Sequence, residues 1–100
     1  MQKRIEDIKR QETFLNKGTE LITRLEALLQ EWKEYQPEFR KLMDYYQSPQ
    51  WMEDFQDSNE GMFEDFPCGV LSQDAVYDLY SEQRTLNFEM IRVGLSYLED

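Results

Sequence analysis

The chain has 100 residues, of which 40% are apolar and 14% aromatic, and its 21 acidic and 11 basic side chains give a net charge of −10. This length predicts one domain, and the aromatic content excludes a disordered chain despite the charge. No apolar run approaches the roughly eighteen residues of a membrane-spanning helix, the opening MQKRIEDIKR is too polar for a signal peptide, and the single Cys68 cannot form an internal disulfide. We therefore expect a cytoplasmic protein.

The first long segment predicts one helix from about residue 2 to 46. With Ile8 as position a of a heptad, apolar residues recur at positions a, d and g as far as Tyr46. The a positions are Ile8, Leu15, Ile22, Leu29, Gln36 and Met43; the d positions are Gln11, Gly18, Leu25, Trp32, Phe39 and Tyr46; the g positions are Phe14, Leu21, Leu28, Tyr35 and Leu42. This width fits a bundle helix that packs against two neighbours.

Pro37 lies inside this segment, and a proline usually ends or kinks a helix. The heptad phase nevertheless continues through Pro37 to Tyr46, and Pro37 itself falls at the outer position b. The pattern therefore favours one helix bent at Pro37 and roughly 65 Å long, with a break at the proline as the alternative.

A short second helix is predicted from about residue 49 to 57. Ser48 is a suitable N-cap and Pro49 suits the first turn. Trp51, Met52 and Phe55 then follow at helical spacing, and we expect them to fold back over the end of the long helix. This gives a structural aromatic corner of Tyr46, Trp51 and Phe55.

Residues 58–71 form the predicted connector, in which apolar side chains hold an extended segment against the core. These side chains are Met62, Phe63, Phe66, Val70 and Leu71.

The last helix is predicted from about residue 73 to 98, with Ser72 as its N-cap. One apolar stripe consists of Val76, Leu79, Gln83, Leu86, Met90, Val93 and Tyr97. A second consists of Phe88, Ile91, Leu95 and Leu98, on nearly the opposite side. We therefore expect this helix to be buried on two sides from residue 86 onward. The predicted fold is all-α, with a long kinked N-terminal helix antiparallel to a C-terminal helix and a short middle helix.

Catalytic chemistry has little support. The chain has no histidine, so histidine-dependent nucleophiles and histidine zinc sites are absent. The acidic segment around Gly61 fits no frame of a calcium-binding EF-hand loop, and no cation stands near Cys68 to activate its thiol. We expect no enzyme activity, no cofactor and no metal site.

The charge is unevenly distributed along the chain. Residues 42–83 carry ten acidic side chains and no Lys or Arg, so their field repels nucleic acid and anionic membranes and attracts a basic partner. The candidate acidic patch is Asp54, Asp57, Glu60, Glu64 and Asp65. The simpler interpretation is a solvated surface that keeps a small protein soluble.

Three segments, DYYQSPQW, EDF and GVLSQDAVYDLY, resemble a bacterial family of small acidic proteins known as the domain of unknown function 4298. Residues Gly69 to Leu79 are the most specific part of this resemblance. The resemblance implies a short helical cytoplasmic protein with no assigned activity, and it carries over no catalytic residue.

The preferred functional hypothesis is a non-enzymatic protein–protein interaction module built on a helical hairpin. Its candidate interaction residues are Ile5, Ile8, Phe88, Ile91, Leu95 and Leu98. Ile5 and Ile8 belong to the part of the long helix that extends beyond the shorter last helix, by roughly 25 Å. A second copy in a two-fold dimer is the simplest cover for these residues. Alternatively, residues 49–71 fold back over these faces within one chain. A different hypothesis is an acidic decoy or adaptor that binds a basic protein and, at the extreme, mimics nucleic acid.

Overall fold

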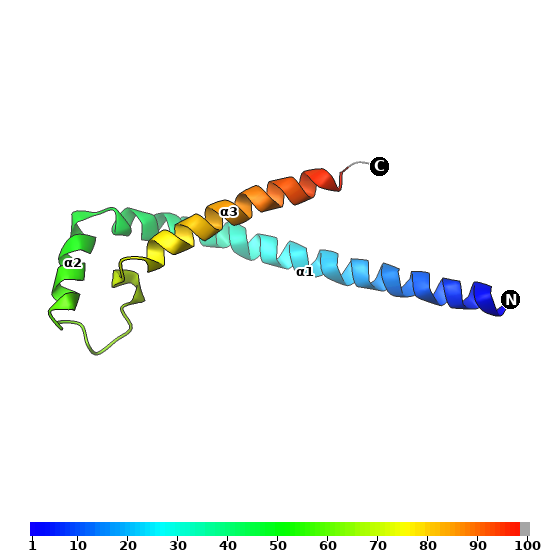
Figure 1. Ribbon diagram of the computed structural model, residues 1–100, viewed down its shortest axis with the longest axis horizontal. Coiled ribbons are helices and arrows are strands. Elements are labelled where there is room, and N and C mark those ends of the chain that lie inside the picture. The colour runs from blue at the N-terminus through cyan, green and yellow to red at the C-terminus, as the bar shows by residue number, and fades with distance from the viewer. Residues whose placement is uncertain (99–100) are drawn as a thin grey trace. The chain divides into compact units, whose positions relative to one another are not determined.

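The computed structural model describes residues 1–98. These residues form three α-helices, α1 (Gln2–Tyr46), α2 (Pro49–Asn59) and α3 (Ala75–Ser96), with a short 3-10 helix, η1 (Gly69–Leu71), before α3 (Figure 1). The described part of the chain contains no strand. The predicted all-α fold with a long N-terminal helix, a short middle helix and a C-terminal helix is confirmed. The chain divides into two units at Phe39, which we describe separately.

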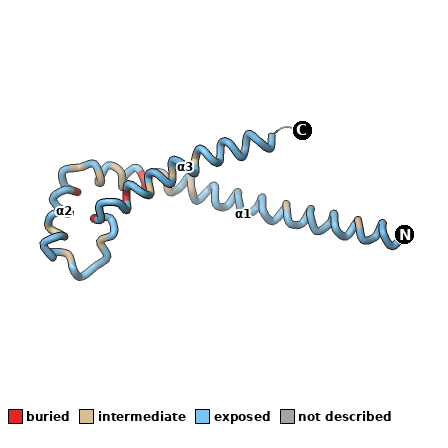
Figure 2. The backbone as a smooth tube through the Cα atoms, in the orientation of Figure 1, coloured by how far each residue is buried: buried red, intermediate tan, exposed pale blue. Residues whose placement is uncertain are grey.

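The first unit, residues 1–39, is a single helical arm formed by most of α1. In Figure 2 almost all residues of this arm are coloured as exposed. Up to Glu31 every residue is exposed except Asp7 and Gly18, which are half-buried. Burial increases at its C-terminal end, where Trp32, Tyr35 and Gln36 are half-buried and Phe39 is 8% exposed. The Tyr35 ring lies 6.0 Å from that of Trp32 and 6.1 Å from that of Phe39.

α1 continues through Pro37, as the unbroken heptad phase predicts. Pro37 is exposed, so its ring occupies the outer side of the helix. The missing amide hydrogen costs one backbone hydrogen bond. Gln36, the residue before the proline, donates its side-chain amide hydrogen to the Trp32 carbonyl, one turn back along the helix, at 3.1 Å. The bend at Pro37 stays a prediction.

The second unit begins at Arg40, and in it the last turns of α1 lead directly into α2. Ser48 takes an extended conformation, and its Oγ accepts a hydrogen bond from the Trp51 amide at 3.3 Å while Pro49 occupies the first turn of α2. The Ser48 hydroxyl also donates to the Tyr45 carbonyl at 2.6 Å. One serine therefore ends α1 and starts α2.

Trp51 holds this unit together. Its side chain is 8% exposed, its ring meets the Tyr46 ring edge-on at 5.0 Å, and it stacks on Phe55 at 5.1 Å. Its indole N–H donates to the Val70 carbonyl at 2.8 Å, which joins α2 to η1 across nineteen residues of sequence. Phe55 and Tyr46 are half-buried, whereas Met52 is exposed. The expectation that Met52 folds over the corner is wrong, because its side chain is 51% exposed.

α2 ends in a turn at Gly61, where the backbone conformation requires a glycine. Gly61 has φ +85°, a left-handed conformation that favours glycine. The Met62 amide donates to the Asp57 carbonyl at 3.1 Å and the Gly61 amide to the Ser58 carbonyl at 3.0 Å, which is the Schellman pattern of helix ends. This cap satisfies two carbonyls and turns the chain towards η1.

The connector after this cap packs less than the sequence predicts. Leu71 is buried and Phe63 half-buried, but Met62, Phe66 and Val70 are exposed. Their predicted contact with the core is therefore wrong. Val70 contributes through its main-chain carbonyl, which accepts the Trp51 indole bond, rather than through its side chain.

α3 is anchored at its beginning and uncovered towards its end. Ser72 Oγ accepts a hydrogen bond from the Ala75 amide at 3.1 Å, and the Tyr46 hydroxyl donates to the Gln73 carbonyl at 3.3 Å. Val76 is 3% exposed, but from residue 84 to 98 every residue except the half-buried Asn87 is exposed. The predicted burial of two sides from residue 86 is wrong, because an apolar stripe shows which side chains favour burial but not whether the chain can cover them.

Replacing Trp51 with alanine should cost about 3–5 kcal/mol of unfolding free energy, the range for large-to-small changes at buried aromatic positions. Chemical denaturation followed by circular dichroism measures this loss. Met52→Ala, one residue away on the exposed side of α2, is the matched control and should change the free energy by about 0.5 kcal/mol or less. Equal, small losses in both variants would contradict the central role of Trp51.

A second polar contact spans the junction of α1 and α2. The Tyr45 hydroxyl donates to Asp54 Oδ2 at 2.6 Å, and the Gln50 amide donates to Asp54 Oδ1 at 2.8 Å. Burial, followed by the Asp54 bond and charge, raises the pKa of Tyr45 to about 12. The hydrogen bond from Tyr45, then that from Gln50, lowers the pKa of Asp54. The bond thus favours a protonated phenol beside an ionised carboxylate.

The Tyr45 phenol should therefore lose its proton at a higher pH than an ordinary tyrosine. The unfolded chain releases this proton at about pH 10 and the folded chain at about 12, so the contribution of the bond to stability is lost as the pH rises between these values. On the acid side it is lost as the pH falls through the lowered pKa of Asp54. Tyrosinate absorbance at 295 nm measures this titration, and circular dichroism at each pH confirms that the chain is still helical. One phenol should titrate near pH 12 in the parent and be missing in Tyr45→Phe. If the difference between the two titration curves is instead centred near pH 10, the assignment to Tyr45 is refuted.

Candidate protein-interaction surfaces

The largest exposed apolar surface of the first unit follows one side of α1. We call it the α1 stripe; its members are 39–64% exposed and are Ile5, Ile8, Phe14, Leu15, Leu21, Ile22, Leu25, Leu28 and Leu29. Eight of the nine occupy heptad positions a, d and g, and Ile5 lies at the adjoining position e. Their spacing keeps them on one side of the helix over about seven turns.

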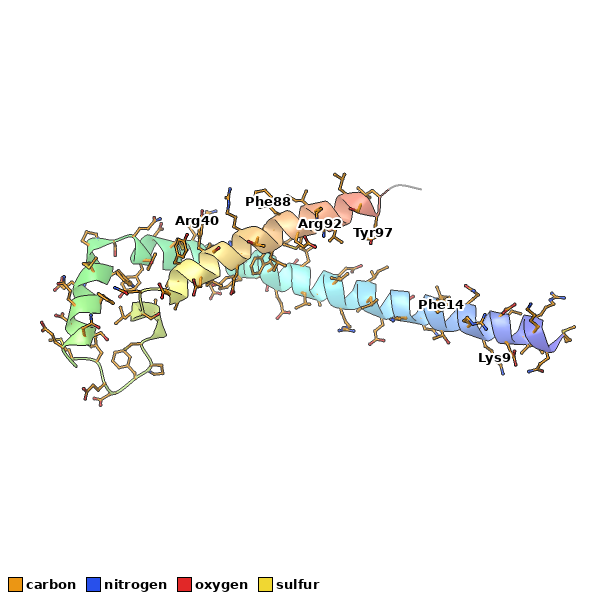
Figure 3. The ribbon with its side chains drawn as sticks, viewed as in Figure 1. Lys9, Phe14, Arg40, Phe88, Arg92 and Tyr97 are labelled. Carbon is orange, nitrogen blue, oxygen red and sulfur yellow. The ribbon has the colours of Figure 1, made fainter. Side chains whose placement is uncertain are left out.

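The remaining sides of this arm are polar and locally satisfied. The Thr13, Thr19 and Thr23 hydroxyls each donate to the carbonyl four residues earlier, at 3.0–3.1 Å. Arg10 pairs with Asp7 at 3.0 Å, with both side chains exposed. Figure 3 labels Phe14 and Lys9 on this arm, whose side chains extend outward from the ribbon. The polar sides are suited to water, so the α1 stripe is the side that lacks a suitable environment.

A second exposed apolar surface lies on the C-terminal half of α3 and continues to Leu98, just after the helix. We call it the α3 face, and its members, 60–75% exposed, are Phe88, Ile91, Leu95 and Leu98. The Arg84 guanidinium lies 5.2 Å from the centre of the Phe88 ring, a cation–π contact. Arg92 pairs with Glu89 through two hydrogen bonds of 2.6 and 3.0 Å, and this pairing raises the pKa of Arg92. Figure 3 shows Phe88, Arg92 and Tyr97 along this helix.

A shallow hollow of about 330 Å³ borders the α3 face. It is lined by Tyr80, Gln83, Arg84, Asn87, Phe88 and Ile91. All of these side chains come from one helix, so the hollow is a shallow groove in the surface of α3.

Only part of these surfaces was predicted from the sequence. The predicted interaction residues include all four members of the α3 face, but only Ile5 and Ile8 of the α1 stripe. The apolar positions from Phe14 to Leu29 were assigned to the core, and the structure leaves their side chains exposed. The signal that could have found them is the length of α1, which at 45 residues has about twice the 22 residues of α3.

The candidate acidic patch surrounds the end of α2. Glu60, Glu64 and Asp65 are exposed, while Asp54 and Asp57 are half-buried. Asp54 is engaged with Tyr45 and Gln50, and the Asp57 main chain belongs to the helix cap. Across residues 1–98 no group of three or more acidic or cysteine side chains is arranged to hold a metal ion.

No helix in the described part of the chain combines the length and the apolarity that a bilayer span needs. No curated protein and no solved structure matches the chain. A family model described as a domain of unknown function, DUF4298, matches residues 8–93. The match includes α2, η1 and nearly all of α1 and α3, and it agrees with the resemblance of the DYYQSPQW and GVLSQDAVYDLY segments. The chain therefore belongs to the DUF4298 family.

Proposed function

We propose that this protein is a non-enzymatic protein–protein interaction module that acts in the cytoplasm, and that the α1 stripe is its binding element. The observation that carries the proposal is the exposure of nine large apolar side chains along one side of a single helix. Such a contiguous patch, flanked by polar residues, is typical of a site that binds another protein. An amphipathic helix binds a partner through anchors at this spacing.

Physical reasoning also indicates why the stripe needs a partner. A helix gains most of its stability in proteins by packing its apolar side, because propensity alone is marginal in water. Burying a Leu or Ile side chain contributes about 1.5–3 kcal/mol. Residues 1–31 bury none of theirs, so binding of a second helix supplies the packing that stabilises the arm.

Two matched variants test the proposal. Leu25→Glu places a carboxylate in the middle of the α1 stripe, and Ala27→Glu places the same group on the opposite side of the helix. Both residues are exposed, so both variants should fold. A buried, unpaired carboxylate is costly in an apolar interface, so Leu25→Glu should reduce partner binding by at least about tenfold while Ala27→Glu leaves it unchanged.

Binding is measured by affinity capture of cell proteins, and of a differently tagged second copy, on immobilised full-length chain at 0.1 and 0.5 M salt. Every protein retained by the parent should be compared on the two variants. Retention that survives high salt and is lost only in Leu25→Glu supports the module. If no retained protein distinguishes Leu25→Glu from Ala27→Glu, the α1 stripe is not a binding element.

An acidic adaptor is the second candidate, because residues 42–83 carry ten acidic side chains without a single Lys or Arg. Binding of a basic protein to this segment would weaken steeply with salt, since exposed charges are screened beyond about 8 Å at physiological ionic strength. It would also be insensitive to Leu25→Glu. The same capture experiment therefore separates the two functions.

A further inference from the structure

We infer that the partner of the α1 stripe is a second copy of this chain, bound parallel and in register along residues 5–29 of α1. The inference rests on the proposed function and specifies its occupant. Four features of the described residues agree on this one arrangement: the area of the stripe, the glycine at its middle, the glutamine within it and the charges on its two borders.

The area of the α1 stripe suffices for a specific interface. Eight of its nine members occupy positions a, d and g, which lie within about 50° of the direction of position d. All eight therefore face the second copy when position d points at it. Burial of one such side chain, at about 25 cal/mol per Å², corresponds to roughly 60–120 Å², so the eight offer on the order of 500–1,000 Å² per copy. Specific protein–protein interfaces take about 800 Å² from each partner.

Gly18 lies at the middle of the stripe, at position d. A glycine inside a helix costs about 1 kcal/mol relative to alanine. The Gly18 backbone has no left-handed φ, and a Cβ added there would meet no other atom within 4 Å, so nothing within the chain requires this glycine. Without a Cβ, a second helix can approach closely at this point. The side chains that flank Gly18 on the stripe, and that would then interlock, are Phe14, Leu15, Leu21 and Ile22.

Gln11 distinguishes the two directions in which a second helix can bind. It is exposed and occupies position d, one heptad before Gly18. A parallel two-fold pair sets each residue against its counterpart, so the two Gln11 amides face each other, and each can donate and accept a hydrogen bond. An antiparallel pair that overlays the same stripes sets Gln11 between Ile22 and Leu25 of the second copy, where burial of an unpaired amide is costly. A polar residue at one seam position selects register in coiled coils in the same way.

The charges on the two borders of the stripe complement each other in a parallel pair. One border, position c, carries Arg10, Lys17 and Arg24, and the other, position e, carries Glu12, Thr19 and Glu26; all six residues are exposed. A two-fold axis along the helices sets border c of each copy beside border e of the other. Arg10 then lies beside Glu12 of the second copy. Arg24 lies beside Glu26 in the same way, and each contact occurs twice in the pair.

The antiparallel alignment of the same stripes brings like charges together. It sets border c against itself in the opposite direction. Arg10 then meets Arg24 of the second copy, and Lys17 meets its own counterpart, so like charges repel along this border. Parallel pairing is therefore the arrangement in which the apolar area, the Gln11 amides and the border charges are all satisfied together.

Sedimentation equilibrium of the full-length chain at tens of micromolar and 0.15 M salt tests the occupant. We expect a mass of twice the 12.2 kDa chain for the parent and for Ala27→Glu, and the mass of one chain for Leu25→Glu. A parent that sediments as a monomer overturns the inference. If such a monomer still captures another protein through Leu25, the proposed function stands and only the second copy is rejected.

Charge reversal tests direction and register. Arg24→Glu alone and Glu26→Arg alone each place like charges at two contacts of the parallel pair. Because exposed pairs are worth about 0.2–1 kcal/mol, the dissociation constant of each variant should rise about fivefold. An equimolar mixture of the two variants restores opposite charges at both contacts of the mixed pair, and it should associate within about twofold of the parent.

Two outcomes of this experiment contradict the parallel pair. In the antiparallel alignment Arg24 faces Arg10, so Arg24→Glu alone would lower the dissociation constant. A mixture that associates no better than the separate variants would show that Arg24 and Glu26 do not face each other. Circular dichroism on each variant confirms that its helix content matches that of the parent.

Disulfide formation measures the direction independently. In a Cys68→Ser background, Gln11→Cys chains and, separately, Leu25→Cys chains should each join with their own kind in a glutathione redox buffer, because position d sets the two thiols of a parallel pair face to face at the spacing that a disulfide needs. Thr13→Cys, on the outer side of the helix, is the matched control and should stay unjoined. In the antiparallel alignment the introduced thiols stand at least about 18 Å apart along the axis, so the parallel pair is rejected if neither Gln11→Cys nor Leu25→Cys joins.

Discussion

Uneven burial is the constraint that governs this protein. Within residues 1–98 the buried apolar side chains are Phe39, Trp51, Leu71 and Val76, and three of these lie in the unit that begins at Arg40. There the Trp51 indole joins α2 to η1 through the Val70 carbonyl, and its ring contacts fix the end of α1 against α2. The arm before this unit has the apolar pattern of a packed helix but no packing of its own up to Glu31.

The sequence allowed the helices to be predicted because local physics decides them. The heptad phase carried α1 through Pro37, and Ser48 and Pro49 marked the start of α2. Burial was harder to predict, because it depends on what the rest of the chain can reach. Phe88, Ile91, Leu95 and Leu98 have the spacing of a core stripe but are exposed, and Phe66 of the connector is exposed as well. The hydrogen bond from the Trp51 indole to the Val70 carbonyl could not be predicted from the sequence, because the periodicity of side chains says nothing about which main-chain carbonyl accepts a bond.

The residues of the candidate site, too, were only partly predictable from the sequence pattern. Ile5 and Ile8 were predicted from the excess length of α1, a quantity that the sequence contains. Leu21, Leu25 and Leu28 were assigned to the core because their spacing is the same in a hairpin, a bundle and an unpartnered helix.

The net charge of −10 sets the conditions under which two copies could pair. Two such chains repel each other at low ionic strength, and this repulsion is screened over about 10 Å at 0.1 M salt. The apolar contact of the α1 stripe does not depend on charge. Because salt screens the repulsion between two whole chains and leaves the apolar contact unchanged, moderate salt should strengthen any self-association through the α1 stripe, opposite to its effect on an acidic surface that binds a basic protein.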